Sequence, residues 1–206
     1  MLNNNELDHL AIKYGTDKSS NGHNYTRLYH FYFKNIRNQV ENVLEIGVAR
    51  GFSLHMWADY FPNATIHGID VGPHCKQYEE NRIKIHIGDG TDELFLKETL
   101  SDIKFDIIID DGSHLSLDQY TSFIYLFPYL TKYGFYIIED IGELDSIRGP
   151  GKSLTERLME HTCFIVDRKN TECQIFSIQY FKNIVFILKD LNDNNSFQIS
   201  QKRNRI

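Results

Sequence analysis

The apolar positions along the chain follow two periods, one typical of strands and one of helices. From residue 42 onward, short apolar runs alternate with stretches in which apolar residues recur every three or four positions. The predicted strands are Asn42–Ile46, Ala64–Ile69, Ile83–Ile87, Phe105–Ile109 and Tyr133–Ile138. The predicted helices are Ser53–Tyr60, Ser116 to about Leu130, and Ser153–His161. The last two open with the spacing of a capping box, Ser followed three residues later by Gln or Glu.

Two more apolar runs follow near the C-terminus. Gln174–Phe181 and Ile184–Leu188 are separated only by Lys182 and Asn183, which predicts an antiparallel hairpin. Strands that alternate with helices indicate a mostly parallel, doubly wound sheet. We therefore predict an α/β, Rossmann-like fold in a single domain, 1–206, with an antiparallel C-terminal hairpin.

The first 40 residues differ from the rest, because they are helical in pattern and rich in aromatic side chains. Tyr25, Leu28, Tyr29 and Tyr32 fall on one helical face. We interpret this face as a packing stripe that docks a helical N-terminal segment, 1–40, on the core, 41–206. The alternative is a cap over the active site.

Composition narrows the classes of function. The net charge of -6 argues against a nucleic-acid binder, which needs a basic face. No apolar run approaches the roughly 18 residues of a membrane span, and the N-terminus lacks the pattern of a signal peptide. The three cysteines have neither a disulfide framework nor C-x-x-C spacing. We expect a cytoplasmic protein that binds neither nucleic acid nor membrane.

The first predicted strand leads into a glycine loop, LEIGVARG. Ala49 stands at the second glycine of G-x-G-x-x-G, so the dinucleotide fingerprint is absent and a dehydrogenase is disfavoured. What remains is the acid Glu45 followed by Gly47 and Gly51. Ligands of open α/β sheets bind at the carboxyl ends of strands. An acid there suits a cationic ligand that carries an amino-acid group better than it suits a pyrophosphate.

Acids also follow the next two strands. Asp70 ends the second strand, where a carboxylate can accept both hydroxyls of a ribose, and Asp89 follows the third, where an acid can meet an adenine amino group. Each acid alone is more often a turn former. The ordered set favours S-adenosylmethionine. The predicted cofactor-binding residues are Glu45, Gly47, Gly51, Asp70, Asp89 and Asp110.

These motifs, LEIGVARG, GID and GD, resemble those of class I S-adenosylmethionine-dependent methyltransferases over nearly the whole chain. The resemblance implies that Glu45 and Gly47 lie near the methionine part, Asp70 at the ribose and Asp89 near the adenine. Ala49 departs from the commonest family pattern, E-x-G-x-G-x-G.

The most informative motif is DDGSH at 110–114, paired with Glu139 and Asp140. Both follow predicted adjacent parallel strands, whose backbones lie about 4.8 Å apart, so Asp111 should converge with the other two acids. Such acids repel unless a proton or a cation neutralises them. Oxygen ligands suit Mg²⁺, Mn²⁺ or Ca²⁺ better than zinc, and His114 can then serve as the general base. The alternatives are an ordinary Asp-Gly turn and a histidine that bonds the turn backbone.

A metal beside a methyl donor has a chemical reason. A sugar or alcohol hydroxyl is scarcely ionised near neutral pH, and a metal lowers the pKa of a coordinated oxygen, for water from 15.7 to about 7. Chelation of neighbouring hydroxyls also orients the attacking oxygen.

DDGSH with the following Glu139-Asp140, together with KYGTDK at 13–18, resembles the metal-dependent sugar O-methyltransferases of macrolide biosynthesis. The resemblance implies that Asp111, Glu139 and Asp140 hold Mg²⁺ and that His114 is the base. It also implies that KYGTDK contributes to the cofactor or substrate pocket, and that 148–152 forms a loop over the acceptor. The expected acceptor is a small-molecule sugar or glycoside, and a homo-oligomer is left open.

Three other functions share part of this pattern. N-methylation or catechol-type O-methylation of a small molecule shares the fold and differs in the acceptor pocket. A metal-dependent oxygenase is disfavoured, because non-heme iron prefers two histidines and His114 is the only one in the cluster. A degenerate cofactor-binding module would have lost the carboxylates, and all of them are present.

Overall fold

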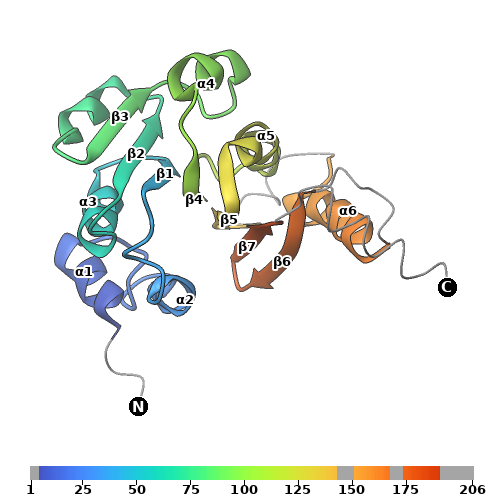
Figure 1. Cartoon of the computed structure of the whole chain (residues 1–206), viewed down its shortest axis with the longest axis horizontal. Coiled ribbons are helices and arrows are strands. Elements are labelled where there is room, and N and C mark those ends of the chain that lie inside the picture. The colour runs from blue at the N-terminus through green and yellow to red at the C-terminus, as the bar shows by residue number, and fades with distance from the viewer. Residues whose placement is uncertain (1–4, 143–150, 168–173, 191–206) are drawn as a thin grey trace.

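The computed structural model describes residues 5–142, 151–167 and 174–190. In this part of the chain seven strands form one sheet, shown in Figure 1. The strands are β1 (Asn42–Ile46), β2 (Thr65–Asp70), β3 (Ile83–Ile87), β4 (Phe105–Asp110), β5 (Leu130–Glu139), β6 (Ile175–Phe181) and β7 (Ile184–Lys189). Their order is β3-β2-β1-β4-β5-β7-β6. The first five are parallel, and β7 is antiparallel to both β5 and β6. The predicted parallel sheet with an antiparallel C-terminal hairpin is confirmed.

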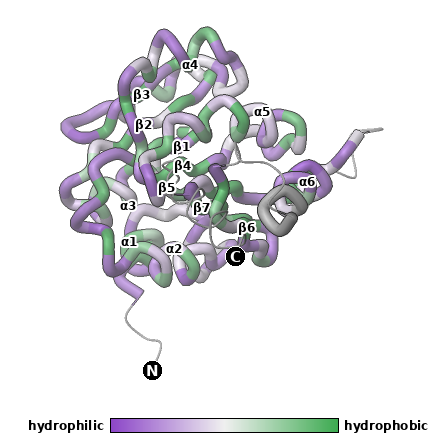
Figure 2. Tube along the Cα trace, turned by 45° about the vertical axis from the view of Figure 1, so that its right-hand side comes forward, coloured by the Kyte–Doolittle hydropathy of each residue, from purple (hydrophilic) through white to green (hydrophobic). Residues whose placement is uncertain are grey.

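Helices cover both faces of the sheet. They are α1 (Glu6–Tyr14), α2 (Thr26–Phe33), α3 (Phe52–Tyr60), α4 (Glu93–Leu100), α5 (Ser116–Leu126) and α6 (Leu154–Asp167), with short 3₁₀ turns η1 (Pro73–Tyr78) and η2 (Phe127–Tyr129). Successive residues of β4 enter different cores: Ile107 and Ile109 join the cluster with α1–α3, and Ile108 joins the cluster with α4–α6. The central strands are hydrophobic in Figure 2 because both of their faces are buried.

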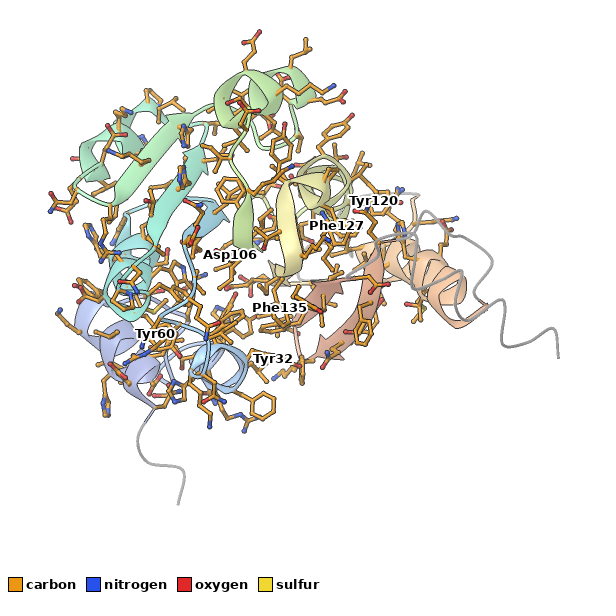
Figure 3. The ribbon with its side chains drawn as sticks, in the orientation of Figure 1. Tyr32, Tyr60, Asp106, Tyr120, Phe127 and Phe135 are labelled. Carbon is orange, nitrogen blue, oxygen red and sulfur yellow. The ribbon has the colours of Figure 1, made fainter. Side chains whose placement is uncertain are left out.

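The N-terminal segment packs on the core as its aromatic stripe predicts. Tyr29 is fully buried, and its ring centroid lies 5.0 Å from that of Trp57 on α3. Tyr32 lies against Phe135 of β5, with ring centroids 5.6 Å apart (Figure 3). The packing interpretation is therefore confirmed, and the tyrosine hydroxyls add polar contacts that are described below.

The boundaries of α5 differ from the prediction. The helix ends at Leu126 rather than near residue 130, because Pro128 lies in η2 and β5 already begins at Leu130. The capping box expected at Ser116 is wrong: its hydroxyl oxygen accepts the backbone N–H of Leu154 at 3.0 Å. Gln119 does not close a box either, since its amide donates to the carbonyl of Glu139 at 2.8 Å.

The second capping box is present. Ser153 N–H donates to the Glu156 carboxylate at 2.7 Å, and Glu156 N–H donates to the Ser153 hydroxyl at 3.2 Å. Two elements were not predicted, α4 and η1. The start of α4 is fixed by Asp92, whose carboxylate accepts the N–H groups of Leu94 and Phe95. None of the helices in the described residues is long and apolar enough to cross a membrane.

Candidate functional site

A pocket of about 460 Å³ opens at the carboxyl ends of the parallel strands. The chain turns in opposite directions after β1 and β4, which are neighbours, and this is the position where doubly wound sheets bind ligands. The pocket is lined by seven of the predicted site residues: Gly47, Asp70, Asp89, Asp110, Asp111, His114 and Asp140. Glu45, Gly51 and Glu139 do not line it.

The loop after β1 needs glycine where the sequence has it. Gly47 has φ +92°, and a Cβ there would lie 2.1 Å from the carbonyl oxygen of Asp111. Only glycine allows the two loops to approach this closely. Ala49, at the position where the fingerprint has its second glycine, also takes a positive φ of 47°. The loop thus keeps the left-handed turn of a glycine fingerprint although the residue is alanine.

Glu45 faces the protein interior. It is fully buried, accepts a hydrogen bond from the Ser53 hydroxyl at 2.8 Å, and lies 3.4 Å from the Lys18 ammonium. Burial raises the pKa of Glu45, and Lys18 partly opposes that effect. The acid that we expected beside a cationic ligand therefore has an internal cation as its neighbour.

Asp70 and Asp89 line the pocket, and both accept local hydrogen bonds. Asp70 Oδ2 accepts the N–H groups of Val48 and Ala49 at 2.9 and 3.1 Å, and Oδ1 accepts that of Gly72 at 2.7 Å. Burial works to raise the pKa of Asp70, but these three backbone donors outweigh it and lower the pKa. Asp89 Oδ1 accepts hydrogen bonds from the backbone N–H and the hydroxyl of Thr91, both at 2.8 Å. Asp70 thus fixes the loop after β1 from the neighbouring strand.

The strand ends of β4 and β5 converge as predicted. Asp110 stands opposite Ile138 in the parallel register, which brings Asp111 beside Glu139 and Asp140. Asp110 itself is buried, and burial, with a contribution from the charge of Asp111, raises its pKa to about 7.

Three side chains at this edge are spaced to hold a metal ion. Asp111, His114 and Asp140 each offer one ligand atom, and these atoms lie within 4.8 Å of one another. His114 Nε2 is 3.8 Å from Asp140 Oδ2. His114 and Asp140 both have a left-handed backbone, with φ 57° and 52°, which is common at functional sites. Glu139, the other predicted ligand, points instead toward Lys18 and Tyr29.

The N-terminal segment supplies residues that the motifs did not assign. Lys18 is 1% exposed, and its ammonium lies 2.6 Å from both Asp111 Oδ2 and Glu139 Oε2. Burial works to lower the pKa of Lys18, but the charges of Asp111, Glu139 and Glu45 outweigh it and raise the pKa. The described structure therefore pairs three carboxylates with one buried lysine.

Two tyrosines of the aromatic stripe also reach these acids. The Tyr25 hydroxyl donates to Asp140 Oδ1 at 2.6 Å, and that of Tyr29 donates to Glu139 Oε1. Asp17 lines the pocket as well. The signal in the sequence was the choice of tyrosine over phenylalanine on a packing face, because a buried tyrosine hydroxyl needs a partner. Of the predicted acceptor loop, 148–150 lies outside the described residues.

Known proteins resemble this chain both in sequence and in structure. The mycinamicin VI 2''-O-methyltransferase of Micromonospora griseorubida is 33% identical over 91% of this chain. One similar solved structure is that of the MycE methyltransferase from the mycinamycin biosynthetic pathway, in complex with Mg, SAH and mycinamycin VI. It superposes on this chain with a TM-score of 0.80 and 33% sequence identity, and the match covers 91% of this chain and 55% of that protein. This chain is a homologue of sugar O-methyltransferases.

A second relative of this chain is a tetracenomycin-C O-methyltransferase. It is the 8-demethyl-8-(2-methoxy-alpha-L-rhamnosyl)-tetracenomycin-C 3'-O-methyltransferase of Streptomyces olivaceus, 39% identical over 66% of this chain and 37% of its own length. The chain spans 53% of the mycinamicin enzyme. No protein-family model matches this chain. The Rossmann-like fold is that of a class I S-adenosylmethionine-dependent methyltransferase.

Proposed function

We propose that this chain transfers a methyl group from S-adenosylmethionine to a hydroxyl of a sugar or glycosylated small molecule, with a divalent cation bound at the site. One observation carries the proposal. The metal-spaced side chains Asp111, His114 and Asp140 stand on the wall of a pocket at the carboxyl edge of the sheet. Homologues that methylate sugars of antibiotics support it.

The pocket suits S-adenosylmethionine as the methyl donor. Its volume of about 460 Å³ falls in the range of small-ligand sites. We assign the loop at Gly47 to the methionine part of the donor, Asp70 to the ribose and Asp89 to the adenine. The mycinamycin enzyme that this chain resembles was solved with SAH.

The donor set fits a hard divalent cation. The carboxylates of Asp111 and Asp140 are the oxygen ligands that Mg²⁺ and Mn²⁺ accept, and each offers an atom within 4.8 Å of the other and of His114. His114 Nδ1 is buried, and it has no hydrogen-bond partner among the described residues. We propose that Asp111 and Asp140 hold the ion, and Glu139 remains a predicted ligand. When bound, the ion would act as a Lewis acid that lowers the pKa of an acceptor hydroxyl.

The chain's own residues supply the proton acceptor. His114 lines the pocket, and its Nε2 stands 3.8 Å from Asp140 Oδ2. We propose that His114 takes the proton of the acceptor hydroxyl as its oxygen attacks the sulfonium methyl group. The donor loses its positive charge in this step, so the reaction needs no oxyanion hole.

We further propose that residues 1–206 act as one methyltransferase domain, with 1–40 as its helical N-terminal segment. A cytoplasmic location and the absence of nucleic-acid and membrane partners are predictions from the sequence, and a homo-oligomer is left open. The acceptor loop at 148–152 is proposed on the resemblance alone.

The test is transfer of labelled methyl from S-adenosylmethionine to a panel of nucleotide sugars and glycosides, with Mg²⁺ and with EDTA. Label that appears on a sugar only with Mg²⁺ is the expected result. Label that survives EDTA would overturn the metal mechanism. Label found only on amines or catechols in a parallel panel would favour the alternative N- or catechol-type transfer.

A further inference from the structure

Two side chains of the N-terminal segment donate hydrogen bonds to the acids of the proposed metal site. The Lys18 ammonium donates to Asp111 Oδ2, and the Tyr25 hydroxyl donates to Asp140 Oδ1, both at 2.6 Å. Each donor engages one oxygen of its acid. The second oxygen of Asp140, Oδ2, is the one that lies beside His114.

Lys18 is a costly residue at this position. Its side chain is 1% exposed, and an ammonium taken out of water is stable only when carboxylates surround it. An apolar side chain in its place would leave the buried carboxylates of Glu45 and Glu139 without their cation. Tyr25 carries no charge, and a phenylalanine would keep its ring packing and lose only the two hydroxyl bonds, to Asp140 Oδ1 and to the carbonyl of Asn183.

We propose that Lys18 and Tyr25 are positioning residues of the metal site, each fixing one oxygen of Asp111 or Asp140 so that the other oxygen faces the cation. The inference rests on the proposed function. Groups that orient metal ligands in this way typically change metal affinity 10- to 100-fold when they are removed. Lys18, the last residue of the KYGTDK motif at 13–18, would then serve the metal.

A role in charge balance alone makes the opposite prediction for Lys18. Removing a positive charge beside a cation site makes the site more negative, so the cation should bind more tightly. Loss of positioning should make it bind more weakly. Tyr25→Phe changes no charge, so any effect of this substitution on cation affinity reports orientation.

The experiment is a titration of Mn²⁺ into the full chain, followed by electron paramagnetic resonance of the free ion. The variants are Tyr25→Phe and Lys18→Met, and the matched control is Tyr32→Phe. Tyr32 lies on α2 in the same stripe and loses one hydrogen bond, to Gln179, away from the acids. We expect Mn²⁺ affinity to fall about 10-fold or more in both test variants and to stay at the wild-type value in the control. SAH affinity and melting temperature should match between Tyr25→Phe and Tyr32→Phe.

Each other outcome decides against part of the inference. Wild-type Mn²⁺ affinity in Tyr25→Phe overturns the role of Tyr25, and tighter binding by Lys18→Met overturns that of Lys18. If Lys18→Met does not fold, Lys18→Arg keeps the charge but replaces a compact ammonium with a planar fork, so weaker binding is again expected and unchanged binding overturns the role. A wild-type chain that binds no Mn²⁺ overturns the proposed metal site itself.

Discussion

The backbone of Gly47 lies directly against the backbone of Asp111. A Cβ built on Gly47 would stand 2.1 Å from the Asp111 carbonyl oxygen, closer than any real contact allows. Asp111 N–H in turn donates to the carbonyl of Ile46 at 3.0 Å. The loop assigned to the methyl donor and the loop assigned to the metal are therefore packed as one unit, and neither can shift without the other.

Gly47→Ala should weaken the binding of both SAH and Mn²⁺. The added methyl group forces the two loops apart and also strains a backbone at φ +92°. Calorimetric titration of each ligand measures the effect. Gly15→Ala is the control, because Gly15 has φ +76° but nothing within 4 Å of its Cβ position. The coupling would be wrong if Gly47→Ala lost SAH binding while Mn²⁺ affinity stayed at the Gly15→Ala value.

Asp106 should matter for stability and not for the reaction. Its carboxylate accepts the N–H groups of Glu41 and Asn42 at 2.7 and 3.2 Å and the Thr131 hydroxyl at 3.0 Å, tying together the starts of β1, β4 and β5 (Figure 3). Asp106→Ala should lower the free energy of unfolding by about 1–3 kcal/mol, measured by urea titration. Asp102→Ala, at an exposed acid just before the same strand, should change it little. An equal loss in both would remove the special role of Asp106.

The sheet could be predicted because its strands are short apolar runs with clear ends. β1 and β3 have the expected bounds to the residue. The predicted end of α5 lies too late in the chain because apolar residues run from Phe123 to Leu130 without a polar break, although Pro128 is a local signal that the helix stops before it. The capping box at Ser116 failed because of a tertiary contact. Its hydroxyl serves the start of α6, 38 residues away, which local spacing does not reveal.

Part of the candidate site could likewise be predicted from the sequence, and part could not. The convergence of Asp111 with Glu139 and Asp140 followed from the parallel order of β4 and β5. The partner of each acid did not follow, because Lys18 is 93 residues from Asp111 and 121 from Glu139 in the chain. The spacing of the motifs predicts that the acids lie at the carboxyl edge of the sheet. It does not predict which carboxylate oxygens accept hydrogen bonds from a buried lysine.

His67 should make the fold less stable in acid. It is buried on β2, with Nδ1 3.1 Å from Nε2 of His86. Burial lowers the pKa of His67 to about 4, and the charges of His86 and Lys84 add to this. The unfolded chain, with an ordinary histidine pKa of about 6.5, then binds more protons between these values. The contribution of His67 to stability is complete above about pH 6.5 and is lost as the pH falls toward 4, by at most about 3 kcal/mol.

The check on His67 is the free energy of unfolding measured by urea titration between pH 4 and 8. His67→Gln should make the rise of the unfolding free energy with pH smaller over this range, because the titrating group is gone. His9→Gln, at an exposed position, should leave the slope as in the wild type. A wild-type slope in His67→Gln would assign the acid sensitivity to other groups.

His114 and Glu139 can be separated by measuring turnover and metal affinity in the same variants. If His114 is the base, His114→Ala should reduce methyl transfer while Mn²⁺ affinity stays near the wild-type value. If Glu139 is a ligand, Glu139→Gln should weaken Mn²⁺ binding. A loss of Mn²⁺ affinity in His114→Ala, with little change in Glu139→Gln, would instead identify the three metal-spaced residues, Asp111, His114 and Asp140, as the ligands.

Asp111→Ala is the most direct test of the proposed site. Asp111 is the one metal-spaced acid that also bonds Lys18, and its side chain is 22% exposed at the pocket wall. Alanine keeps the backbone that packs on Gly47, so SAH affinity should stay within a small factor of the wild-type value. Methyl transfer should be abolished, because the cation loses a carboxylate ligand and the acceptor hydroxyl loses its orientation.

The matched control for Asp111→Ala is Asp118→Ala. Asp118 also lines the pocket, but its carboxylate accepts the Ser113 hydroxyl at 2.8 Å and is not one of the metal-spaced groups. Both substitutions remove one negative charge from the pocket, so a loss of turnover specific to Asp111→Ala cannot come from charge alone. Wild-type turnover in Asp111→Ala would show that the cluster is structural. Equal losses of turnover and of SAH binding would show that Asp111 acts by supporting the loop after β1, since the loss of a metal ligand should reduce turnover and leave SAH binding near the wild-type value.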